Sequence, residues 1–317
     1  MKKIILLPII LGSVLLVAGG ALFAVALYKS KDNRLEHQDY KDLEAFNKFD
    51  IDLTIADFEL KASTDGKATV SVDETKYDKH TVEVKDSALV IKGQDTRKWY
   101  ERLFTFNFFQ KVKVTVFVPE GNYEEFKLES DTGDVTVPGN YTFSNIDVAV
   151  HTGNVKNSAK VTDNLKIHSS TGNISVSDVT AKNVDLKAST GNVSLKSSAI
   201  EEKVELNTST GNITVENVTC NDYASKSSTG SLKLDHTVVA NHIEAKTSTG
   251  SVRFIASDAN TINVKTSTGS VNLNLLTGKT FDCQSDTSKP KYPSSTIGAG
   301  LCKVETDTGS INITVGE

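Results

Sequence analysis

Apolar and polar residues alternate along most of this chain, on both sides of a recurring glycine. The segment 204–215, which reads VELNTSTGNITV, is representative: Val204, Leu206, Ile213 and Val215 are apolar and polar residues stand between them. A two-residue period is typical of a strand with one buried face. A glycine beside Asn or Ser is typical of a turn. Each unit is therefore predicted to form two short strands joined by a corner.

A Thr-Gly pair marks the same point in each unit. Its glycine recurs at Gly133, Gly153, Gly172, Gly191, Gly211, Gly230, Gly250, Gly269 and Gly309. Neighbouring copies are 19 or 20 residues apart, except for a final gap of 40 residues, in which Asp286-Thr287-Ser288 forms a degenerate copy. One unit cannot bury its own apolar face, whereas stacked units bury a continuous column. The sequence predicts an all-β fold, a single-stranded repeat β-solenoid with 19–20 residues per rung.

The alternation predicts two rows of side chains that point into the solenoid. The first row holds Ile146, Leu165, Val184, Val204, Tyr223, Ile243, Ile262 and Phe281, and the second holds Val135, Val155, Ile174, Val193, Ile213, Leu232, Val252, Val271 and Ile311. Thr208, Thr247 and Thr266 share the parity of the apolar residues, so we expect them to point inward and to donate hydrogen bonds along the stack. Threonine arrays that bind ice must face water. This parity therefore disfavours an ice- or surface-binding threonine array, which stays an alternative.

The first 28 residues differ in kind from the rest. After Lys2 and Lys3, residues 4–28 carry no charge, and such a helix is long enough to cross a hydrocarbon core about 30 Å thick. We expect a transmembrane anchor at 1–28, although a signal peptide cleaved near Ala24-Val25-Ala26 stays open. The flanking charges nearly balance. The expected location, a single-pass cell-membrane protein with an extracellular body, rests on the signal-like form of the segment.

Three further regions complete the predicted organisation: a charged juxtamembrane spacer at 29–47, β-rich N-terminal rungs and a cap at 48–123, and the Thr-Gly solenoid at 124–317. Within the second region, aromatic residues gather among cations at Trp99, Tyr100, Phe104, Phe106, Phe108 and Phe109. This segment is interpreted either as a plug for the open end of the column or as a contact with the membrane interface.

These features together point to a known family. A long N-terminal anchor and a β-rich leader precede the segment 112–119, VKVTVFVP, which runs into repeated Thr-Gly-Asn-Ile/Val rungs. Over residues 48–317 the chain resembles the putative adhesin family of bacterial β-strand-repeat envelope proteins, formally a domain of unknown function. The resemblance implies a surface or membrane-associated protein, often linked to envelope stress, and brings no catalytic residues with it.

Composition and cysteine spacing disfavour several kinds of ligand and activity. With 35 basic against 40 acidic residues and no basic block, the chain lacks the clustered cations that nucleic acid requires. The cysteine spacings match no zinc pattern, and Cys283 and Cys302 are two positions out of phase, so we expect free thiols, no metal and no cofactor. The nearly constant rung length builds no walled groove. The chain is therefore not expected to be an enzyme, and a polysaccharide-acting β-helix enzyme stays the alternative.

One outward face carries a pattern of charge. Lys187, Lys226, Lys246 and Lys265 each stand four residues before the glycine, next to an acidic row of Asp147, Asp185, Glu205 and Glu244. This pattern predicts either diagonal ion pairs between rungs on a solvated face or a flat polar surface that binds at many weak points. The partners that fit are an envelope glycan, a wall polymer or another envelope protein.

The C-terminal end of the stack needs a cover, because an open rung pairs readily with another chain. The insertion 289–300, with Pro290 and Pro293, lies close to the last rung. We expect it to fold back over this end and to keep the soluble body monomeric. End-to-end contact with a second solenoid, or an added partner strand, stays open.

Overall fold

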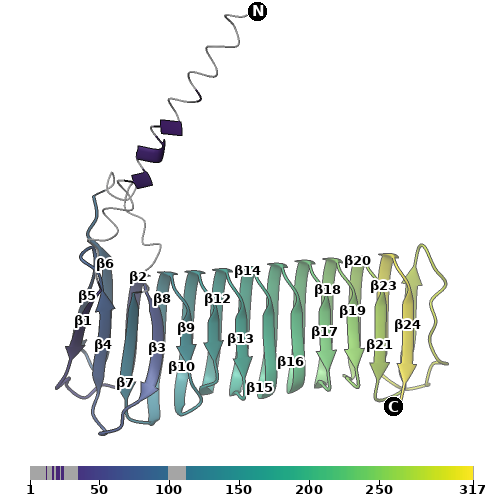
Figure 1. Cartoon of the computed structure of the whole chain (residues 1–317). Coiled ribbons are helices and arrows are strands. Elements are labelled where there is room, and N and C mark those ends of the chain that lie inside the picture. The colour runs from purple at the N-terminus through teal and green to yellow at the C-terminus, as the bar shows by residue number, and fades with distance from the viewer. Residues whose placement is uncertain are drawn as a thin grey trace, which may run out of the picture.

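The computed structural model describes residues 35–98 and 112–316, together with a few helical positions between residues 12 and 24. The described residues contain 24 strands in one continuous sheet, which coils into a long stack (Figure 1). The predicted all-β fold of stacked rungs is confirmed. Within the described parts of the chain, no helix has both the length and the apolar character needed to cross a membrane. The predicted anchor at 1–28 lies largely outside these residues.

The longest face of the solenoid is built from one strand per rung, and all neighbours on it run parallel. Its strands are β2 (Lys48–Ile55), β8 (Gly121–Thr132), β10 (Tyr141–Thr152), β12 (Lys160–Thr171), β14 (Thr180–Thr190), β18 (Val238–Thr249), β20 (Thr261–Thr268), β23 (Leu301–Thr308) and β22 (Thr280–Ser285). After the glycine corner, a shorter face holds β3 (Asp57–Ala62), β9 (Val135–Val137), β11 (Val155–Asn157), β13 (Ile174–Ser177), β17 (Leu232–Asp235), β19 (Val252–Ile255), β21 (Val271–Leu275) and β24 (Ile311–Val315).

Two strands, β15 (Val193–Thr210) and β16 (Ile213–Thr229), run from the short face through a second corner into the next long strand. The sequence pattern did not indicate this corner. It lies where non-glycine residues have a positive φ, at Asp178, Ser197, Asn217, His236 and Ala256. A rung therefore has a second corner in addition to the predicted one at the glycine.

The second predicted inward row is confirmed along its whole length. Its residues are paired rung to rung from Val135 to Ile311, and each is at most 1% exposed. The inward threonines are confirmed as well. The Thr208 hydroxyl donates to the carbonyl oxygen of Gly191 at 3.0 Å, and Thr247 and Thr266 make the same bond two and three rungs further on.

The glycine corner needs glycine because the rungs approach each other there. Gly211 has a φ of 151°, a region that L side chains rarely adopt. A Cβ atom on Gly211 would lie 2.0 Å from the carbonyl oxygen of Gly191. The same close approach recurs from Gly133 to Gly309, which explains why this position repeats so strictly.

The last rungs do not stack in chain order. The rung of β23 and β24 packs directly on the rung of β20 and β21, and β22 lies outside it, paired with β23. In the first inward row, Cys302 therefore stands between Ile262 and Phe281. The prediction that Ile262 and Phe281 are direct neighbours was wrong. The degenerate copy lies beyond Gly309 rather than between Gly269 and Gly309, and the Ser288 hydroxyl donates to the carbonyl oxygen of Gly309 at 2.9 Å.

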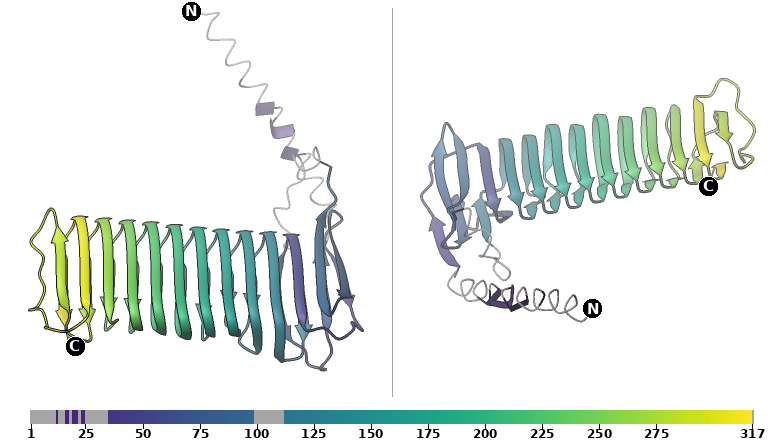
Figure 2. Two further views of the ribbon diagram at one scale, coloured as in Figure 1. Left: turned by 180° about the vertical axis from the view of Figure 1, so that it is seen from behind. Right: turned by 90° about the horizontal axis from the view of Figure 1, so that it is seen from above.

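The insertion 289–300 covers this end of the stack, as predicted. The Lys291 N–H donates to the carbonyl oxygen of Ile311 at 2.9 Å, and the Ile313 N–H donates to the carbonyl oxygen of Lys291 at 2.8 Å. The Tyr292 ring packs on Phe281, with centroids 5.7 Å apart. Figure 2 shows this segment looping around the C-terminal end. Because it also connects the parallel neighbours β22 and β23, deleting it would destroy the rung rather than uncover it.

A proline at Lys291 tests the cover without breaking the connection. The fragment 29–317 should be monomeric in light scattering, and Lys291→Pro should shift it toward dimers, because it removes the N–H that bonds to Ile311 and opens the edge of β24. Lys289→Pro is the matched control, since the N–H of Lys289 has no hydrogen-bond partner in the described chain. A dimer from the unmodified fragment would contradict the capping role.

At the N-terminal end, β6 (Ala88–Asp95) and β7 (Lys113–Val118) extend the parallel stack, and the strands beyond them pair in the antiparallel direction. The strand β6 pairs with β2 and carries β5 (Asp78–Lys85), while β7 pairs with β3 and carries β4 (Thr69–Glu74) and then β1 (Glu36–Tyr40). Part of the predicted spacer 29–47 thus forms a strand of the folded body. The aromatic segment that was interpreted as a plug or a membrane contact falls within residues 99–111, which are not among the described residues.

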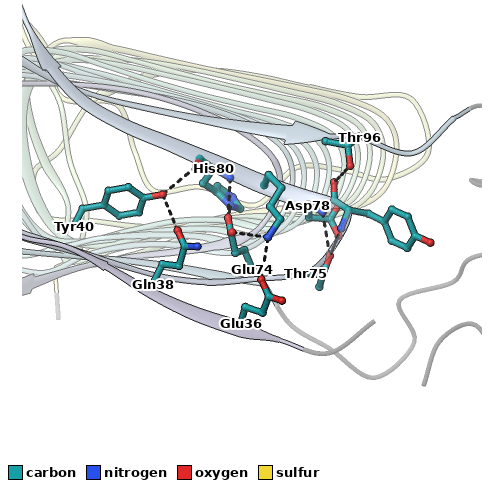
Figure 3. A network of polar contacts seen from close by, with 10 residues as sticks. Glu36, Gln38, Tyr40, Glu74, Thr75, Asp78, His80 and Thr96 are labelled. Carbon is teal, nitrogen blue, oxygen red and sulfur yellow. Dashed lines mark hydrogen bonds and ion pairs between the residues drawn. The ribbon is translucent and has the colours of Figure 1, made fainter. Parts of the chain in front are cut away.

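A buried polar network joins these antiparallel strands (Figure 3). The Glu74 carboxylate, which is 2% exposed, accepts hydrogen bonds from the Lys79 ammonium and from the His80 backbone N–H, both at 2.9 Å. The Asp78 carboxylate accepts one from the Thr75 hydroxyl at 2.8 Å. Burial lowers the pKa of the His80 imidazole, against the opposing effect of Glu74. These contacts satisfy buried charges and so lock these strands together.

Candidate functional site

The four candidate lysines lie in one column on the outer surface of the long face. Rung by rung, the order is Lys187, Asn207, Lys226, Lys246 and Lys265. The column follows from the parallel register, because residues four positions before the glycine stack above one another. All four side chains are partly or fully exposed. The structure thus brings together every lysine that the spacing singled out.

The ion pairs of this column differ from the predicted diagonal pattern. Lys187 contacts Asp185 at 2.7 Å, and Lys246 contacts Glu244; each pair lies on a single strand, two residues apart. The hydrogen bond to Asp185 raises the pKa of Lys187. Lys187 also makes a diagonal contact with Glu205, which is longer, at 4.0 Å. Residues i and i+2 share a face of a strand, so a long lysine reaches its own strand's carboxylate first.

Pairing leaves one lysine available. Lys265 pairs across rungs with Glu305 at 2.9 Å, whereas Lys226 makes no ion pair with any residue in the described ranges. Its strand carries Ala224 where the neighbouring strands carry Glu205 and Glu244. The centre of the face therefore presents the ammonium group of Lys226 without a neighbouring carboxylate. In the rungs on either side, Glu205 and Glu244 each pair with a lysine of their own strand.

The threonines next to the glycines form a second column, which sequence parity did not reveal. These threonines are exposed and in register from rung to rung, and they are Thr132, Thr152, Thr171, Thr190, Thr210, Thr229, Thr249, Thr268 and Thr308. Strict alternation would place Thr210 inside with Thr208, but the chain turns at Gly211 and the side chain projects outward. The parity that disfavoured a threonine array applies only to the inner threonines.

Beyond the corner, asparagine side chains form a hydrogen-bonded ladder. The Asn173 backbone N–H and side-chain amide both donate to the Oδ1 atom of Asn154, at 3.0 and 3.1 Å, and Asn192 repeats both bonds to Asn173. Each Oδ1 atom is therefore used inside the stack. The ladder stabilises the corner, in agreement with the interpretation of these asparagines as corner residues.

Metal ligands and thiols were the remaining candidates for reactive chemistry. They contain no group of three or more His, Cys, Asp or Glu side chains that could hold a metal ion. The cysteines are free. Burial raises the pKa of Cys220 and Cys302 to about 12 and that of Cys283 to about 11, and a thiol is nucleophilic only as the thiolate.

Comparison with known proteins shows the family of this chain. Residues 46–314 match the family described as Toastrack DUF4097, which confirms the predicted resemblance. No curated protein matches the chain. Among solved structures, a putative adhesin from Bacteroides fragilis is 17% identical, with 89% of this chain and 97% of that chain covered and a TM-score of 0.43.

Two further solved structures are similar. A putative adhesin from Parabacteroides merdae is 13% identical, with 90% of this chain and 96% of that chain covered and a TM-score of 0.48. A putative lipid binding protein from Parabacteroides distasonis is 18% identical, with coverages of 77% and 97% and a TM-score of 0.47.

Proposed function

Because the chain belongs to the Toastrack DUF4097 family, we propose that it is an adhesin-like binding protein of the bacterial envelope rather than an enzyme. Segment 1–28 anchors it in the cell membrane, and the solenoid extends outside the cell. The support for this location is the length and apolar character of that segment.

The observation that carries the binding role is the lysine column on the long face. It places four lysines and one asparagine at the constant spacing of the rungs, about 4.8 Å, on one outer surface. A repetitive polymer can contact such a surface at many points, and linked weak contacts add up to strong retention. We therefore assign an envelope glycan or wall polymer as the partner of this face.

Retention of the chain on purified cell walls tests this role. The combined variant Lys226→Ala, Lys246→Ala, Lys265→Ala should reduce retention roughly tenfold or more, because several contacts are lost from one polymer. The matched control is Lys156→Ala, Lys233→Ala, Lys196→Ala on the short face. It removes the same charge and the same kinds of pairing: Lys156 has no ion pair with any described residue, Lys233 pairs along its strand with Asp235, and Lys196 pairs across rungs with Glu216.

Equal loss in both variants would show that net charge, rather than the long face, drives retention. Release of soluble sugar products from the walls would contradict the non-enzymatic role.

A further inference from the structure

A hollow of about 440 Å³ opens near the N-terminal end of the solenoid, away from the lysine column. It lies where the β1–β2 connection meets the turn before β4 and the end of β7. Its walls include Asp42, Glu44, Phe46, Lys67, Pro119 and Tyr123. This volume falls within the range of small-molecule sites in proteins, roughly 300–1,000 Å³.

The aromatic wall of this hollow is held in place by the core. The Tyr123 hydroxyl donates to the carbonyl oxygen of Pro119 at 2.8 Å. The Tyr123 ring packs edge-on against Phe49, with centroids 5.2 Å apart, and the Phe46 ring packs against the same residue at 5.3 Å. Phe49 is 1% exposed. The Tyr123 ring is also stacked with Phe46 and Phe143, at centroid distances of 6.5 and 5.8 Å, so Phe46 is the ring on which a ligand packs. Because Phe46 rests on a buried neighbour, the ligand does not have to order it first.

The rim of the hollow carries charged side chains without partners. Asp42, Glu44 and Lys67 are exposed, and within the described ranges none of their charged groups makes a hydrogen bond or an ion pair. Asp42 also has a φ of 56°, a backbone conformation that is uncommon for residues other than glycine. Two acceptors and one donor therefore surround an aromatic wall.

We propose that this hollow binds one pyranose ring of a neutral saccharide. The C–H face of a pyranose is weakly positive and packs well on the negative face of an aromatic ring. Its hydroxyl groups can donate to the carboxylates of Asp42 and Glu44 and accept from the ammonium of Lys67. The two carboxylates repel an anion, and the ammonium of Lys67 reduces the attraction of the rim for a cation. The site goes beyond the polymer-binding face and does not depend on its lysines.

Calorimetry on the full chain in detergent tests the site, with cellotriose and chitotriose as probes. At least one of them should bind saturably. Phe46→Ala should weaken that binding roughly tenfold, about 1.4 kcal/mol, whereas Tyr123→Phe keeps the ring and should retain most of the binding.

The double variant Asp42→Asn with Glu44→Gln should also weaken binding severalfold, since neutral amides are poorer acceptors. These two residues are exposed, so their replacement leaves the fold intact. Lys156→Ala, on the short face, should bind like the unmodified chain.

Three results would overturn the assignment: no heat with either saccharide, binding that survives both Phe46→Ala and the double carboxylate variant, or displacement of the saccharide by choline, which would indicate a site for cations. The outcome is separate from that of the cell-wall assay. The pocket variants keep the lysine column, and the lysine variants keep the pocket, so failure of one proposal leaves the other measurable.

Discussion

Replacing Val193 by aspartate should lower the free energy of unfolding by about 4 kcal/mol. Val193 is fully buried between Ile174 and Ile213 in the second inward row. A carboxylate there would have apolar neighbours above and below it in the row. The loss should appear as a lower midpoint in urea denaturation. Ile213→Asp, one rung further on, should give a loss of similar size.

Lys226→Ala provides the contrast on the outer surface. This lysine has no ion pair to lose within the described residues, so its replacement should change the free energy of unfolding by less than about 0.5 kcal/mol. Equal shifts in the denaturation midpoint for Val193→Asp and Lys226→Ala would mean that the inward and outward rows are wrongly assigned.

The second large effect is expected at the glycine corner. Gly211→Ala should cost about 3 kcal/mol or more, because the new methyl group would meet the carbonyl oxygen of Gly191 at 2.0 Å. That oxygen belongs to the backbone of the neighbouring rung and cannot move without opening the stack. Thermal unfolding of the variant measures the loss.

Gly66→Ala separates this clash from the effect of backbone conformation. Gly66 has a φ of 72°, but a Cβ atom there has open space around it. The substitution should cost only about 1 kcal/mol, the usual penalty for a left-handed conformation. If Gly211→Ala is no more harmful than Gly66→Ala, close packing of the rungs does not explain the repeated glycine.

The candidate site could be predicted in part. A constant rung length places equal positions above one another, so the spacing alone located Lys187 to Lys265 in one column. The direction of the ion pairs could not be predicted, because it depends on how far each side chain reaches from its own strand. The outward threonines were missed because alternation holds only along a straight strand and fails at the turn before Gly211.

The hollow near Tyr123 had no signal in the sequence. Its walls come from three stretches around Asp42, Lys67 and Pro119, which are separated along the chain and meet only where the N-terminal antiparallel strands fold over the first rungs. The aromatic residues that stood out in the sequence, from Trp99 to Phe109, are different ones, and they lie outside the described residues.

The sequence by itself determined the repeat, the two inward rows and the glycine corner, because each is a local consequence of strand periodicity and of what a Cβ atom excludes. Only the tertiary structure decided the order of the last rungs. The segment 301–315 carries Gly309 and a complete second strand, so it can pack closely on the rung of Gly269. Ser288 carries a Cβ atom at the degenerate corner and has no complete second strand after it. Its half-rung therefore occupies the end of the stack, where it needs only one neighbour.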